Sequence, residues 1–113
     1  MAESILDSTK TWLGIAVDEL AFDAEILMLI NSGLSTLSDL NIGPAPVPVV
    51  IDNTFGWSSL TMDNGQLGNV QLYVFITAKL GFDPPQSTSV LDSFKEQKRE
   101  LEWRINERAE NAK

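Results

Sequence analysis

The sequence contains no cysteine and no histidine. Without cysteine, the chain has neither a disulfide framework nor a thiolate metal site. Without histidine, it lacks the side chain that most often acts as a general base or as a metal ligand, and every catalytic triad that depends on it. These two absences exclude most of the common catalytic and metal centres. We therefore expect no cofactor and no bound metal.

Long hydrophobic runs are also missing. The longest uninterrupted apolar runs, residues 26–30 and 72–76, are five residues each, whereas a helix needs ~20 residues to span a membrane. The first residues, Met1, Ala2 and Glu3, supply neither the basic region nor the apolar region of a signal peptide. We expect a soluble protein with no membrane partner, working in a cytoplasm or in a particle assembled there.

Positive charge is scarce in the first part of the chain. The net charge is −8, and the residues through Gly65 account for all of it, with nine carboxylates and one lysine. The remaining residues hold seven carboxylates and seven Lys or Arg. Such a chain repels a phosphate backbone rather than binding it. Solubility explains this charge, and so does a surface that must lie near DNA without adhering to it.

Carboxylates are plentiful, but their pattern does not indicate catalysis. Pairs such as Asp18 with Glu19 are adjacent in sequence, which does not place two acids across a cleft as glycoside hydrolysis requires. Asp52 and Asp63 lack the spaced ligands and the closing glutamate of a calcium loop. Helix caps and solvated loops explain these side chains. We therefore expect no enzyme, and a hydrolase that uses Asp52 or Asp63 is a weak alternative.

The patterning predicts four helices in one domain, residues 1–113, because a chain of this length typically forms a single domain. Ser4 is suited to cap a first helix and Gly14 to end it in a left-handed conformation. The run 72–76 has no polar side, which predicts a helix surrounded by others. The predicted helices are residues 5–13, 23–40, 66–80 and a last one that begins at residue 87 or residue 89 and ends at about residue 108. The fold class is all-α, a small bundle with a long C-terminal helix and an irregular Pro/Val-rich middle loop.

Residues 43–65 form that middle loop. Its three prolines, between residues 44 and 48, restrict the β-branched run that follows to an edge or irregular segment. The loop also contains Phe55 and Trp57. Long loops with their own apolar residues are typically functional. We predict that Phe55 and Trp57 contact another protein chain, and the alternative is a loop packed on its own chain.

The last helix has an apolar stripe and an aromatic residue away from it. The stripe, expected to pack on the third helix, is formed by Leu91, Phe94, Leu101 and Ile105. Trp103 follows Leu101 by two residues and so lies about 200° round the helix, among charged side chains. Because Trp and Arg are enriched at interface hot spots, Trp103 is predicted to be a protein-interface anchor. The arginines predicted to join it are Arg99, Arg104 and Arg108. The alternative is a cation–π pair between Arg99 and Trp103 within one helix.

Several segments together resemble one protein family. They are residues 5–15 (ILDSTKTWLGI), 22–26 (FDAEI), 30–32 (INS), 82–85 (FDPP) and 100–105 (ELEWRI). In order and spacing they resemble the head–tail connector (adaptor) proteins of tailed bacteriophages. The resemblance extends from about residue 4 to residue 108 and matches the middle loop only loosely.

That resemblance implies a small helical protein of the virion that assembles as a ring, typically twelve-fold. The ring docks on the portal protein after genome packaging, extends the DNA channel and offers an attachment surface to a tail or head-completion protein. DNA would pass through without specific binding. The implied location is the head–tail junction, with assembly in the host cytoplasm, and there are no catalytic residues to transfer. The competing hypothesis from composition is an acidic regulatory or DNA-mimic module that binds a host protein.

Overall fold

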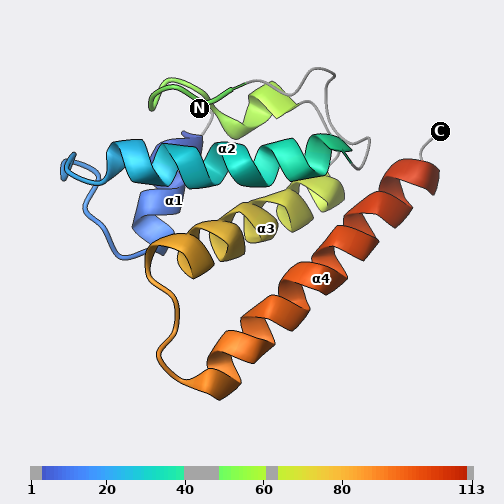
Figure 1. The fold of residues 1–113 in the computed structure, drawn as a ribbon. Coiled ribbons are helices and arrows are strands. Elements are labelled where there is room, and N and C mark those ends of the chain that lie inside the picture. Colours follow the sequence, from blue (N-terminus) through green and yellow to red (C-terminus); the bar gives the residue numbers. More distant parts are fainter. Residues whose placement is uncertain (1–3, 40–48, 61–63, 112–113) are drawn as a thin grey trace.

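A computed structural model describes residues 4–39, 49–60 and 64–111, and within these ranges the chain is helical with no β-strand (Figure 1). The elements are α1 (Ile5–Trp12), α2 (Asp23–Asp39), a short 3₁₀-helix η1 (Trp57–Leu60), α3 (Asn64–Phe82) and α4 (Thr88–Asn111). The prediction of an all-α fold with a long C-terminal helix is confirmed.

The first helix begins at the predicted residue and ends one residue earlier than predicted, at Trp12. The hydroxyl oxygen of Ser4 accepts a hydrogen bond from the backbone N–H of Asp7 at 3.1 Å, which satisfies one of the unpaired donors of the first turn. After the helix, Gly14 adopts a φ of 82°, a conformation that costs glycine no steric strain. The chain can therefore turn sharply toward α2.

Helix α3 is the centre of the fold, because it packs against α1, α2 and α4. Figure 1 shows it between α2 and α4. Its buried side chains are Val70, Tyr73, Val74, Ile76 and Ala78. The prediction that the run 72–76 is enclosed on every side is wrong at one position. Leu72 is 43% exposed, so one strip of α3 stays uncovered.

Both C-terminal helices are longer than their sequence pattern indicated. Helix α3 begins at Asn64 and α4 continues to Asn111. At the start of α4, the carbonyl oxygen of Ser87 accepts from the N–H of Leu91 at 2.9 Å, and its hydroxyl lies 3.5 Å from the N–H of Val90. Ser87 therefore caps this helix, which begins at the next residue, Thr88. Of the two starts predicted from the sequence, the structure supports the one at residue 87.

The described part of the middle loop, residues 49–60, packs on its own chain. The side-chain amide of Asn31 on α2 binds the backbone of Val50 twice, donating to its carbonyl oxygen at 2.9 Å and accepting from its N–H at 2.8 Å. The N–H of Ile5 donates to the carbonyl oxygen of Phe55 at 2.9 Å. These bonds hold the segment against α1 and α2. The three prolines lie outside the described residues.

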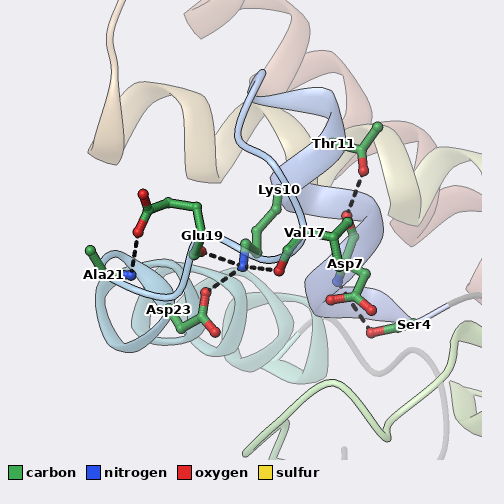
Figure 2. Close-up of polar contacts among 8 residues, drawn as sticks. All are labelled: Ser4, Asp7, Lys10, Thr11, Val17, Glu19, Ala21 and Asp23. Atoms are coloured by element: carbon green, nitrogen blue, oxygen red, sulfur yellow. Dashed lines mark hydrogen bonds and ion pairs between the residues drawn. The ribbon is translucent and has the colours of Figure 1, made fainter.

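A buried lysine organises the connection between α1 and α2 (Figure 2). The ammonium group of Lys10, which is fully buried, donates to the carbonyl oxygens of Val17 at 2.9 Å and Glu19 at 2.7 Å. It also pairs with Oδ1 of Asp23, the first residue of α2, at 2.7 Å. Two of the three ammonium donors thus have carbonyl acceptors, and the carboxylate balances the charge of the group. The connection thus folds around Lys10, which is the only Lys or Arg through Gly65.

Replacing Lys10 by methionine should destabilise the fold strongly, because it leaves two carbonyl groups and the Asp23 carboxylate without their partner. We expect the free energy of unfolding to fall by about 3 kcal/mol, measured by urea denaturation. Lys79→Met is the matched control, since Lys79 pairs with Asp83 at 2.9 Å on the surface. The control should cost less than about 1 kcal/mol. Equal losses in the two variants would contradict a structural role for the buried pair.

Candidate docking surface

Helix α4 presents one apolar side to the core and a tryptophan to the outside. Leu101 and Ile105 are buried against the rest of the chain, whereas Trp103 is 65% exposed. The predicted opposite position of Trp103 is therefore found, and the predicted stripe is found in part: Leu101 and Ile105 are buried, Phe94 is partly buried against the core, and Leu91 does not belong to it. A large exposed aromatic side chain on a charged helix face is the kind of residue that anchors protein interfaces. We call this side of the helix the outer face of α4.

The arginines near Trp103 are engaged in pairs along the same helix. Arg99 pairs with Glu96 at 2.7 Å and Arg104 with Glu100 at 2.6 Å, all on the surface. Such exposed pairs contribute little stability each.

The alternative, a cation–π pair between Arg99 and Trp103, is not found among the described residues. The cation–π contact there is between Lys98 and Tyr73, with Nζ 5.5 Å from the ring centroid. Arg108 is exposed and interacts within the chain.

Polar contacts with α3 fix the rotation of α4 and so the direction of Trp103. The Tyr73 hydroxyl donates to Glu102 at 2.6 Å. Seven residues earlier on α3, the side-chain amide of Gln66 donates to the carbonyl oxygen of Ile105 at 2.9 Å in a buried position. Directional bonds of this kind discriminate between rotations that apolar packing alone would tolerate.

Two of the predicted interface residues serve the internal packing of the chain. Trp57 is 3% exposed, stacks on Trp12 with ring centroids 5.8 Å apart, and lies with its indole nitrogen 3.3 Å from the Ser8 hydroxyl. Phe55 is partly buried against the core. In this fold Trp57 thus packs on its own chain, and its contact with another protein chain stays a prediction. Its packing partners lie on a helix 45 or more positions earlier in the chain.

Sequence reasoning missed an apolar hollow on the uncovered strip of α3. It has a volume of about 450 Å³, is open to solvent, and is lined by Trp12, Gly68, Gln71, Leu72 and Phe75. The four residues from α3 recur at the spacing of one helix face. This spacing is visible in the sequence, but it includes a glycine and a glutamine, so it does not indicate an apolar stripe. We call this surface the Trp12–Phe75 hollow.

A third apolar surface lies on the α1–α2 connection. Val17, Leu20 and Phe22 are all exposed there, on the backbone that Lys10 holds in place (Figure 2). Phe22 also packs edge-on against Phe82 of α3, with ring centroids 5.2 Å apart. The connection is therefore held both by Lys10 and by the contact between Phe22 and Phe82, although its apolar side chains are exposed.

The described residues contain no group of three or more potential metal ligands. Asp52 is exposed, and hydrogen bonds from the Thr54 hydroxyl and N–H lower the pKa of its carboxyl group. A general acid requires the opposite shift. Asp63 lies outside the described ranges. No described helix is both long and apolar enough to cross a membrane.

The contact between Tyr73 and Glu102 predicts an alkaline titration. Burial, and then the hydrogen bond to the carboxylate, raise the pKa of Tyr73 far above its ordinary value of 10.0. Stability from this group is complete below pH ~10 and is lost as pH rises toward the higher pKa of the folded chain. Because Tyr73 is the only tyrosine, tyrosinate absorbance reports it directly. We expect the native chain to titrate well above the urea-unfolded chain.

The Tyr73→Phe variant provides the matching stability measurement. It should be about 2 kcal/mol less stable at neutral pH, the cost of losing a hydrogen bond to a charged group, and should lose less stability than the natural chain above pH ~10. Native and unfolded titrations that coincide would show that the hydroxyl is not held by Glu102.

Comparison with known proteins agrees with the resemblance noted from the sequence. The family model described as phage connector protein matches residues 5–112. No curated protein and no solved structure matched the chain. The match covers α1 through α4 and the middle segment, which is nearly the whole chain. This chain therefore belongs to the phage connector protein family.

Proposed function

We propose that this phage connector acts as a head–tail adaptor whose copies form a ring on the portal protein. In that position it extends the DNA channel and provides the surface to which a tail or head-completion protein attaches. The family supports a connector role and a place in the virion. The observation that supports assembly most directly is the 65% exposure of Trp103 on the outer face of α4, because isolated aromatic anchors on charged surfaces mark protein contacts.

The charge distribution suits a channel through which DNA must move freely. Through Gly65 the chain has nine carboxylates and one lysine, and that lysine is buried among its acceptors. The described surface of this part, including Asp18, Glu19 and Glu25, is therefore acidic. An acidic wall repels phosphate groups. We propose that DNA passes without specific binding, as in a conduit.

The proposed partners are further copies of the chain, the portal protein and a tail or head-completion protein. Proteins of a structural connector family are typically non-enzymatic, and we propose no catalytic activity. Assembly would take place in the host cytoplasm, and the final location is the head–tail junction of the virion. A twelve-fold ring is the size that the resemblance implies.

The acidic surface also favours the alternative, a DNA-mimic module that binds a host protein. The two functions differ in their complexes. An adaptor forms rings with itself or on the portal, whereas a DNA mimic forms a one-to-one complex with a DNA-binding protein. Native mass spectrometry and negative-stain microscopy of the purified chain, alone and with the portal protein of the same phage, distinguish these outcomes. A strictly two-fold dimer at every concentration would contradict the adaptor function.

Trp103→Ala should weaken assembly far more than it lowers the melting temperature, because the side chain has few contacts within its own chain. We expect an association constant at least tenfold lower, since truncating an interface anchor commonly costs about 2 kcal/mol, and a melting temperature within a few degrees. Gln97→Ala, at an exposed position of the same helix, is the control and should change neither. A steep fall in melting temperature with intact assembly would place Trp103 in the core instead.

A further inference from the structure

We infer that Trp103 of one copy docks into the Trp12–Phe75 hollow of the next copy, and that this contact joins neighbours in the ring. The inference rests on the proposed ring-forming function and specifies its interface. It connects the two surfaces of the described chain that have complementary shapes. One is a projecting indole ring that is 65% exposed, and the other is an open apolar recess of about 450 Å³.

The hollow has the chemistry of a protein contact and not that of a small-molecule site. Trp12 and Leu72 are 40% and 43% exposed at its edges, and Phe75 packs edge-on against Trp12 with centroids 6.3 Å apart. Gln71 is the one polar side chain among its lining residues. Ligand pockets combine apolar walls with several convergent polar groups. The Gln71 amide alone does not form such a set, but it suits the N–H of an indole ring.

Gly68 keeps the hollow open. A Cβ atom added at this position would meet no heavy atom within 4 Å. Glycine in the interior of a helix costs ~1 kcal/mol relative to alanine, and the fold of this chain does not require glycine here, since no close packing or positive φ is recorded at Gly68. The recess at Gly68 therefore has room for a side chain from another copy.

The two surfaces point in opposite directions across the α3–α4 layer. Tyr73 faces α4 through its bond to Glu102, and Phe75, two residues later, lies about 200° round α3. Trp103 in turn lies about 200° round α4 from Leu101, which is buried against the rest of the chain. A chain with the donor surface on one side and the acceptor surface on the other makes head-to-tail contacts, and such contacts generate rings when the rotation closes.

The test uses variants that each remove one half of the contact. Trp103→Ala removes the projecting ring and keeps the hollow. Gly68→Leu fills the hollow, keeps Trp103, and should raise the melting temperature because leucine favours helix and its Cβ atom meets open space. Each variant alone should associate about 30-fold more weakly than the natural chain, the loss of one aromatic hot spot. Gly68→Ala is the matched control and should assemble within about threefold of the natural chain.

Mixing the two defective variants gives the decisive result. The Trp103 of a Gly68→Leu chain can enter the hollow of a Trp103→Ala chain, but neither chain can extend further. Native mass spectrometry should therefore show a one-to-one heterodimer and nothing larger. Rings formed by either variant at the concentrations that suffice for the natural chain would overturn the inference while leaving the proposed function intact. Failure of the natural chain to form rings, alone or on the portal protein, would overturn both.

Discussion

The fold depends on burial of α3, which is more apolar than any other helix of the chain and is covered by its neighbours on three flanks. Helices α1, α2 and α4 provide that cover, and the core residues gather around their common contact with α3. A helix that is apolar on most of its surface needs neighbours all round. In the described chain one strip of α3, beside Trp12, has no neighbour. The apolar surface of α3 that drives folding is therefore left partly exposed there.

Much of this fold could be predicted because its determinants are local. A serine before an apolar run and a glycine after it fixed the two ends of α1, as capping chemistry leads one to expect. The stripe on α4 followed from helical periodicity. The 3₁₀-helix at Trp57–Leu60 was not predicted, because its Trp57 is held by Trp12 and Ser8 of α1 rather than by neighbours in sequence. The role of Lys10 was also hidden, since its acceptors lie seven to thirteen positions later in the chain.

The two tryptophans predicted to be interface residues show where sequence reasoning gives the direction of a side chain and where it does not. Trp103 lies in a regular helix, so its position relative to Leu101 determined which way it faces. Trp57 lies in an irregular segment, where periodicity gives no direction, and Trp12 covers it. Trp12 itself has one face on Trp57 and another on the hollow. Its mixed environment follows from tertiary contacts that no local pattern contains.

The caged ammonium group of Lys10 has a consequence for recognition. A loop that orders only on contact loses conformational entropy at that moment, and the affinity falls accordingly. The α1–α2 connection has already lost that freedom during folding, because Val17, Glu19 and Asp23 are tied to one buried cation. Its exposed side chains, Val17, Leu20 and Phe22, are thus preorganised. A protein that binds this connection meets a segment that is already ordered. Binding therefore carries no entropy cost for ordering it.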